Sequence, residues 1–310
     1  MPPLTAERAR AGTYSIVARD AATGELGVAV QSHWFSVGPI VPWAQTGVGA
    51  VATQSNVEVS YGPRGLELLK RGADAPAALR QLVDEDPQAD SRQVAIVDSR
   101  GAIAVHTGAA CMPFAGHSRG AGVSCQANIM ASDTVWPAML SAYERHQGAL
   151  TERLLAALDA AELEGGDIRG RQSAALLVVP AAGHPWDTVI SLRVEDHPDP
   201  LDELARLVRL NEAYTLAGRG DERVAEGRHE EAATLYLEAS RLAPESHELQ
   251  FWAGMGAAQM GDLEAGLHHV RAAITAQPGW RELLGRLPAE VAPAAAAVHA
   301  RLDSPGPAAH

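Results

Sequence analysis

The stretch that decides the fold is ARAGTYSIVARD, residues 9–20, in which Gly12 and Thr13 stand directly before a β-branched apolar run. A second apolar run, ELGVAVQSH, follows the turn sequence AATG, where Gly24 suits a tight hairpin. The sequence therefore predicts a β-hairpin that opens at Thr13. Taken by itself, Thr13 is an ordinary β-branched residue at the start of a strand.

Farther along the chain, groups of strands alternate with groups of helices. Two more strands are expected in PIVPWAQTG and VGAVATQS, and helices in GPRGLELLKRG and DAPAALRQLVDED, the second capped by Asp74. The hairpin RQVAIVDSRGAIAVHTG and the strand GVSCQANIM precede helices over residues 133–147 and 150–163. The strands SAALLVVPA and TVISLRVED close the region. This order predicts stacked layers, with sheets lying between helices.

The composition excludes several classes of function. The chain has 310 residues, 46% of them hydrophobic, and a formal net charge of −13. No apolar run reaches the roughly 18 residues that a membrane span needs, and the N-terminal residues lack the apolar segment of a signal peptide. Nucleic-acid binding needs a basic surface, which this charge disfavours. We therefore expect a soluble cytoplasmic protein of two domains that binds neither membrane nor nucleic acid.

The two cysteines, Cys111 and Cys125, predict neither a disulfide framework nor a metal site. Both lie in small-residue, apolar surroundings, and no Cys/His spacing resembles that of a zinc site. We expect buried structural thiols, no metal and no cofactor.

A second region begins after DHPDP, residues 196–200, where two prolines interrupt the strand pattern. The chain then becomes helical and rich in alanine. Six positions recur 34 residues later: Gly220, Gly227, Ala232, Tyr236, Ala239 and Pro244 correspond to Gly254, Gly261, Gly266, Val270, Ala273 and Pro278. This period and its pattern of small residues resemble the tetratricopeptide repeat.

The repeats cover about residues 213–280. We expect the helix 201–214 and the terminal helix PAEVAPAAAAVHARL to cap the stack. The predicted domains are therefore an extension or propeptide over 1–12, an α/β domain over 13–200, helical repeats over 201–303 and a disordered tail over 304–310.

Consecutive blocks of the first region resemble an uncharacterised bacterial family, domain of unknown function ten twenty-eight. The blocks are TYSIVARDAATGELGVAVQSHWFSVG, VPWAQTGVGAVATQS, SYGPRGLELL, GDIRGRQSAALLV and DHPDPLDEL. The family is in turn similar to the N-terminal nucleophile (Ntn) hydrolases, the group that includes the proteasome β-subunits. The resemblance implies a four-layer α/β/β/α sandwich, which agrees with the predicted order of elements.

The resemblance also implies that Thr13 is a nucleophile and that its own α-amine is the base. A threonine hydroxyl is weakly nucleophilic unaided, and an α-amine with a pKa of about 7.7–8.0 suits proton transfer at neutral pH. The amine must then be free, although residues 1–12 precede it. Three explanations stay open: a propeptide cut between Gly12 and Thr13, a wrongly assigned start codon, and a true extension that leaves the site inactive.

Four further residues are candidates for catalysis because the resemblance implies polar groups at their positions. Ser32 and His33 end the second strand, Asn128 ends the strand GVSCQANIM, and Ser173 keeps the serine of the proteasome run Arg-Asp-x-x-Ser-Gly-Gly. The run here is RGRQSAA, residues 169–175, which lacks the aspartate. Asp167 is a possible substitute, and the alternative is a turn in which Asp167 pairs bidentately with an arginine.

Substrate-binding groups are expected at two places. The only lysine, Lys70, falls in a predicted helix, so any cationic help must come from an arginine, with Arg19, Arg169 and Arg171 as candidates. Backbone N–H groups after the fourth strand suit an oxyanion hole. The candidates for this wall are Thr53, Gln54, Ser55 and Asn56. A polar connecting loop without a catalytic role is the alternative.

On this resemblance we expect an Ntn-type amidohydrolase that acts on a small amide or peptide-like substrate. The repeats are expected to bind a protein or peptide partner, and the protein to form a homo-oligomer. The alternative is a non-catalytic scaffold with an Ntn-like domain. A hydrolase based on Cys111 or Cys125 comes third, because neither cysteine has an evident histidine partner.

Overall fold

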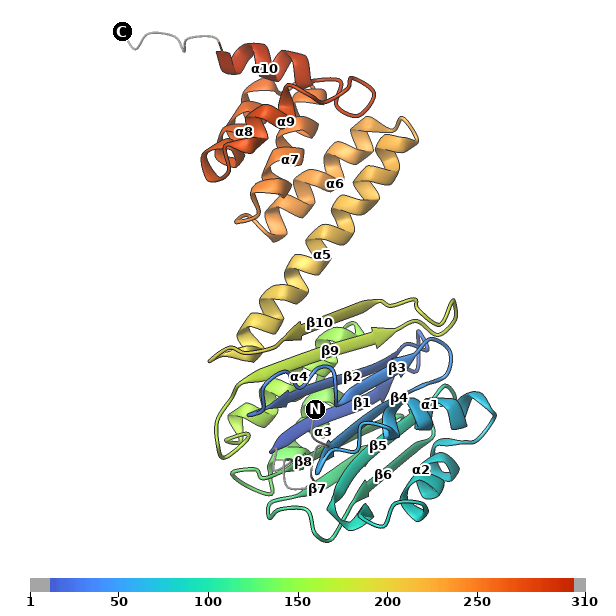
Figure 1. Cartoon of the computed structure of the whole chain (residues 1–310). Helices are drawn as coiled ribbons and strands as arrows, with labels where there is room; N and C mark the ends of the chain where they lie inside the picture. Colours follow the sequence, from blue (N-terminus) through green and yellow to red (C-terminus); the bar gives the residue numbers. More distant parts are fainter. Residues whose placement is uncertain (1–11, 304–310) are drawn as a thin grey trace, which may run out of the picture. The chain divides into compact units, whose positions relative to one another are not determined.

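A computed structural model describes residues 12–303 of the chain. The chain divides into two compact units between Ala205 and Arg206. The first unit is built of two β-sheets and helices and the second of helices, so the expected mixed α/β region followed by a helical region is confirmed (Figure 1). The predicted tail over 304–310, and the predicted extension up to residue 11, lie outside the described residues. No described helix is both long and apolar enough to cross a membrane.

The larger sheet has six antiparallel strands in the order β10-β9-β2-β1-β8-β7. Its strands are β1 (Thr13–Arg19), β2 (Leu26–Ser32), β7 (Gly116–Gly120), β8 (Val123–Asn128), β9 (Ser173–Val179) and β10 (Ile190–Val194). The hairpin of β1 and β2 turns at Gly24, whose φ is +76°, a conformation that favours glycine. The apolar pattern does not predict strand β7, because GHSRG contains no large apolar side chain; the strand lies at the edge of the sheet.

The smaller sheet has the order β3-β4-β5-β6. Its strands are β3 (Pro42–Gln45), β4 (Gly49–Ser55), β5 (Arg92–Asp98) and β6 (Ile103–Thr107), with a short 3₁₀ turn at Ala89–Ser91 before β5. Strand β3 is shorter than predicted, because Val41 donates its amide hydrogen to the Val37 carbonyl in a turn that precedes the strand. The second predicted hairpin is present and turns at Gly101, with φ +87°.

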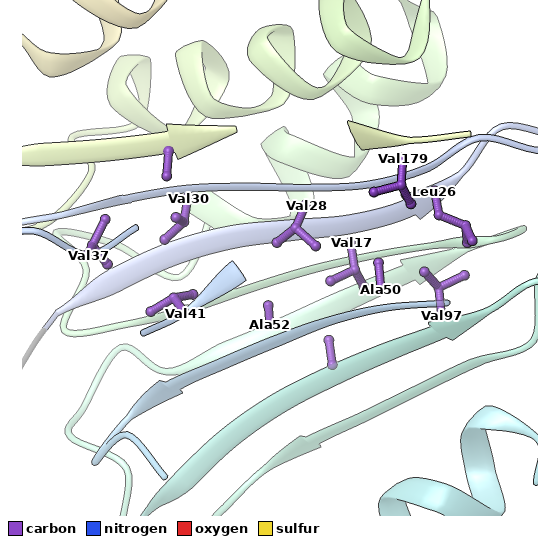
Figure 2. Packing of buried hydrophobic residues seen from close by; sticks show 12 residues of the cluster. Val17, Leu26, Val28, Val30, Val37, Val41, Ala50, Ala52, Val97 and Val179 are labelled. Carbon is purple, nitrogen blue, oxygen red and sulfur yellow. The ribbon is translucent and has the colours of Figure 1, made fainter. Parts of the chain in front are cut away.

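The two sheets pack face to face around a buried apolar cluster. Figure 2 shows Val17, Leu26 and Val28 of the larger sheet with Ala50, Ala52 and Val97 of the smaller sheet in this cluster. The burial of each such valine or leucine contributes roughly 1.5–3 kcal/mol relative to exposure. The cluster therefore holds together two sheets that share no strand.

Helices cover the outer faces of the sheets. Helices α1 (Tyr61–Lys70) and α2 (Ala75–Asp84) pack on the smaller sheet, and α3 (Val135–Arg145) and α4 (Leu150–Leu163) on the larger one (Figure 1). The predicted N-cap is present, because the Asp74 carboxylate accepts a hydrogen bond from the Ala77 amide at 2.8 Å.

The described part of the second unit is helical. Its helices are α5 (Pro200–Ala225), which begins six residues before the unit, α6 (His229–Leu242), α7 (His247–Gln259), α8 (Leu263–Ala276), α9 (Gly279–Leu284) and α10 (Ala295–Asp303). The helix expected over 201–214 is present but longer than predicted, because α5 runs without a break to Ala225. Helix α10 begins later than predicted, two residues after Pro293.

Repeat-related positions have similar surroundings in this unit. A Cβ atom on Gly220 would lie 2.6 Å from the Tyr236 ring, and one on Gly254 would lie 2.7 Å from the Val270 side chain. Gly254 lies 34 positions after Gly220, and Val270 lies 34 positions after Tyr236. Glycine at positions 220 and 254 therefore allows each of the two helix pairs to approach closely.

Candidate active site

A row of buried polar side chains crosses one end of the larger sheet. Thr13, the first residue of β1, is paired with Ser32 at the end of β2 and with Asn128 at the end of β8. Ser32 is in turn paired with Ser173, the first residue of β9. None of the four is more than 1% exposed. Antiparallel pairing thus aligns four of the five predicted catalytic residues, because each is the first or last residue of its strand and these strand ends lie side by side.

The Thr13 hydroxyl belongs to a short hydrogen-bonded chain. Its Oγ1 lies 3.0 Å from Ser32 Oγ, and Ser32 Oγ donates to the Gly12 carbonyl oxygen at 2.6 Å. A serine hydroxyl has one hydrogen to donate, so Thr13 must be the donor to Ser32. The chain runs from Thr13 through Ser32 to the carbonyl of the peptide bond that joins Gly12 to Thr13.

A guanidinium reaches the same carbonyl oxygen. Arg169 Nη2 donates to Gly12 O at 3.0 Å. Asp167 fixes this side chain, because it accepts hydrogen bonds from Arg169 Nη2 at 2.7 Å and from Arg169 Nε at 3.0 Å. The Asp167 carboxylate is fully buried, whereas the Arg169 side chain is partly exposed. The bidentate pair considered as an alternative in the sequence is therefore present, and it directs the guanidinium to Gly12.

Two buried side-chain amides donate hydrogen bonds to the Thr13 carbonyl oxygen. Gln54 Nε2 donates to it at 3.2 Å and Asn128 Nδ2 at 3.4 Å. Both amides also donate to Gln93 Oε1, at 2.8 and 3.0 Å. The backbone of Thr13 is thus anchored to both sheets, because Gln54 and Gln93 belong to the smaller one.

Three residues that no sequence motif indicates complete this network between the sheets: Gln93, Gln126 and Ser15. Gln126 Nε2 donates to Ser15 Oγ at 2.6 Å, and Ser15 Oγ donates to Gln54 Oε1 at 2.5 Å. The available signal was the occurrence of glutamines inside otherwise apolar strands, since a buried amide requires hydrogen-bond partners.

The four predicted oxyanion residues are not brought together at Thr13. Gln54 contacts Thr13 directly, but Thr53 Oγ1 donates to Glu58 O at 3.1 Å. The Asn56 amide and side chain both bond to Ser91, and Ser55 bends the chain away from the strand with φ +70°. These hydrogen bonds stabilise the loop that follows β4, which agrees with the alternative of a polar connecting loop without a catalytic role.

Three of the predicted site residues make their hydrogen bonds and ion pairs with neighbouring loops: His33, Arg171 and Ser173. The His33 amide donates to Asp167 at 3.2 Å, and its ring Nδ1 lies 3.4 Å from Arg171 O. Arg171 forms an ion pair with Asp199 at 3.0 Å. Ser173 Oγ donates to Trp34 O at 2.5 Å. These residues therefore order the loops that flank the site. Arg19, the third arginine candidate, donates to Ser99 O at the far end of β1.

The surroundings of the two cysteines disfavour a cysteine nucleophile. Burial raises the pKa of the Cys111 thiol, and burial also raises the pKa of the Cys125 thiol far above its ordinary value. A thiol with a raised pKa is protonated at neutral pH and therefore weakly reactive. Cys111 Sγ is hydrogen-bonded to Arg92 O.

The fold and site define a two-sheet α/β domain with a buried threonine at the first residue of its central hairpin. The chain belongs to the family of unknown function DUF1028, whose model matches residues 13–204. It is similar to the crystal structure of protein SPO2555 from Silicibacter pomeroyi, of the same family, with 30% identity and a TM-score of 0.58 over 64% of this chain and 88% of that chain.

A more distant similarity is to Anbu (ancestral beta-subunit) from Yersinia bercovieri. It has 13% identity and a TM-score of 0.33 over 60% of this chain and 88% of that chain. No curated protein matches this chain.

Proposed function

We propose that this protein is a self-cleaving Ntn-type amidohydrolase with the four-layer α/β/β/α fold of that class and with Thr13 as its nucleophile. The observation that carries the proposal is the convergence of two donors, Ser32 and Arg169, on the Gly12 carbonyl oxygen. An attack on a peptide carbonyl requires a nucleophile next to the carbonyl carbon and hydrogen-bond donors that stabilise the charge developing on the oxygen. The Thr13 hydroxyl and the two donors provide these groups. The start of the family match at Thr13 also supports the proposal.

In the first step, Thr13 Oγ1 attacks the carbonyl carbon of Gly12. The hydroxyl proton passes to Ser32 Oγ while Ser32 transfers its own proton to the former carbonyl oxygen, along the hydrogen-bonded chain. Arg169 stabilises the negative charge that develops on that oxygen in the transition state. The tetrahedral intermediate therefore forms without a buried net charge.

The intermediate then collapses to an ester. The C–N bond between Gly12 and Thr13 breaks, and the hydroxyl proton of the intermediate moves to the departing nitrogen. Water hydrolyses the ester, which releases Gly12 as a carboxylate and restores the Thr13 hydroxyl. The products include a free α-amine at Thr13, the base that the mature enzyme needs.

The mature enzyme would act on a small amide or peptide-like substrate by the same chemistry. The Thr13 amine takes the hydroxyl proton during attack and gives it to the leaving amine, and water then hydrolyses the acyl-enzyme. Gln54 and Asn128 keep the Thr13 backbone in position through its carbonyl oxygen. Asn128 Oδ1, which has no hydrogen-bond partner among the described residues, is a candidate acceptor for the new amine.

A non-catalytic scaffold is the second candidate, and the burial of Thr13, which is 1% exposed, favours it. In that case the polar row only joins the two sheets. Under either function, we propose that the helical unit is a tetratricopeptide-like module that binds a protein or peptide partner and supports a homo-oligomer. Its closely packed helix pairs support this part of the proposal.

The mass of the full-length protein after expression tests the proposal. We expect wild-type protein to be converted to a chain that begins at Thr13, Thr13→Ser to be converted as well, and Thr13→Ala to stay intact while folded. Capture by a threonine-reactive electrophile should occur only with the first two proteins. Cleavage of Thr13→Ala at the same bond would point to an external protease, and an intact wild-type chain would favour the scaffold.

A further inference from the structure

The surroundings of Gly12 define which acyl groups the site can hold. We infer that Asp167 restricts the substrate to glycyl amides, in which the carbon next to the reacting carbonyl carries no L side chain. This inference rests on the proposed function, because it concerns the substrate of that same site.

The acyl group of a substrate must occupy the place of Gly12. The self-cleavage ester links the Gly12 carbonyl carbon to Thr13 Oγ1, and an acyl-enzyme links a substrate carbonyl carbon to the same oxygen. Both need the donors on Ser32 and Arg169 at their carbonyl oxygen. The position of Gly12 therefore marks the acyl subsite of the mature enzyme.

That subsite has no room for a side chain of L configuration. A Cβ atom added to Gly12 would lie 2.6 Å from Asp167 Oδ2, 2.8 Å from Oδ1 and 2.9 Å from Cγ. Ordinary contacts between non-bonded carbon atoms are about 3.5–4.0 Å. A methyl group would also displace hydrogen-bond partners from a buried carboxylate, which is costly.

Asp167 is unable to move aside without cost. Its side chain is short and fully buried, and it accepts hydrogen bonds from three atoms of Arg169 and from the His33 amide at distances of 2.7–3.2 Å. A shift of the carboxylate would also release the Arg169 guanidinium that donates to Gly12 O. Steric exclusion and positioning of the oxyanion donor are thus coupled in one residue.

The selectivity is tested with two substrates that differ by one methyl group, N-acetylglycyl and N-acetyl-L-alanyl p-nitroanilide, and with the mature full-length protein. We expect kcat/KM to be about 10- to 200-fold higher for the glycyl compound. This is the range of discrimination that enzymes achieve between substrates that differ by one methylene group. Asp167→Asn keeps the shape of the side chain and should keep the ratio. Asp167→Ala should bring the ratio close to one, although both absolute rates fall. Equal rates for the two compounds with wild-type protein would overturn the inference.

Self-cleavage gives a second readout that does not depend on the choice of substrate. The Gly12→Ala precursor, followed by mass after cell-free synthesis, should be cleaved at least about tenfold more slowly than wild type. Adding Asp167→Ala to Gly12→Ala should remove most of that difference relative to Asp167→Ala alone. Rapid cleavage of Gly12→Ala would contradict the inference and leave the proposed function intact. A wild-type chain that is never cleaved and hydrolyses neither compound would instead refute the proposed function and the inference with it.

Discussion

Ser32, the last residue of β2, donates its hydroxyl hydrogen to the carbonyl oxygen of Gly12, the residue directly before β1, at 2.6 Å. The same Ser32 oxygen is 3.0 Å from Thr13 Oγ1, so a single side chain contacts both the attacking hydroxyl and the attacked carbonyl of the proposed reaction. This double contact follows from the pairing of Thr13 with Ser32 at the hairpin's open end.

Replacement of Ser32 by alanine should slow self-cleavage strongly. The change removes both the proton relay and one oxyanion donor, and loss of one such donor costs about 10²–10³ in rate. The measurement is the rate of mass conversion after cell-free synthesis. Ser173→Ala is the matched control, since Ser173 is the next residue in the row but bonds to Trp34 O. We expect that control to cleave at the wild-type rate, and similar slowing of both variants would argue against a role for Ser32 in the reaction.

Arg169→Lys should also impair cleavage, even though the charge is kept. A lysine ammonium lacks the planar fork that binds Asp167 bidentately while a further N–H reaches Gly12 O. We expect a decrease in rate of roughly 10²-fold, comparable to the loss of one oxyanion donor. Arg171→Lys is the control, because Arg171 pairs with Asp199 and Glu162 at partly exposed positions. If Arg169→Lys cleaves like wild type, the Arg169 contact with Gly12 is not part of the reaction.

Gln31→Met should stabilise the first unit. Gln31 is fully buried in β2, and neither its Oε1 nor its Nε2 has a hydrogen-bond partner among the described residues. An unsatisfied buried polar group costs about 1–3 kcal/mol, which an apolar side chain of similar shape avoids. Denaturant unfolding should therefore show a free energy of unfolding higher by about that amount.

Gln93→Met is the contrasting substitution in the other sheet. Gln93 accepts from Gln54 and Asn128 and donates to Ala127 O, so its loss leaves several buried groups without partners. We expect a decrease of at least about 2 kcal/mol in the free energy of unfolding. A decrease in the free energy of unfolding for Gln31→Met as well would mean that the Gln31 amide has hydrogen-bond partners in solution.

Acid should weaken the turn of the central hairpin through Asp20. Burial alone would raise the pKa of this carboxyl, but hydrogen bonds from the Thr23 and Ala22 amides, together with the charge of Arg153, hold the pKa below its ordinary value. A lowered folded-state pKa adds stability above the unfolded-state pKa of about 3.9, and this stability is lost as the pH falls through the folded-state value.

The Asp20 contribution is measured by comparison with Asp20→Asn, which removes the charge. The variant should be less stable than wild type at pH 7 by about 1.5–3 kcal/mol, the range for hydrogen bonds to a charged group. The difference should shrink below pH 4, where wild-type Asp20 becomes protonated. A difference that is constant between pH 7 and pH 2 would show that the charge of Asp20 does not stabilise the turn.

Much of the architecture could be predicted from local patterns. The alternating apolar runs, the turn glycines and the Asp74 cap are properties of neighbouring residues, and the structure has the two hairpins and the capped helix where these patterns lie. The edge strand β7 could not be predicted in this way, since GHSRG carries no apolar signal and pairs only through its backbone.

The sequence by itself determined that Thr13 opens a strand and that Ser32 ends the next one, because a short hairpin leaves little freedom in their register. Only the tertiary structure decided that Arg169 reaches Gly12 across 157 residues and that Gln54 and Gln93 of the other sheet support Thr13. The physical reason is range: backbone pairing within a hairpin is specified by adjacent residues, whereas side-chain contacts between packed sheets and loops depend on how the whole core closes.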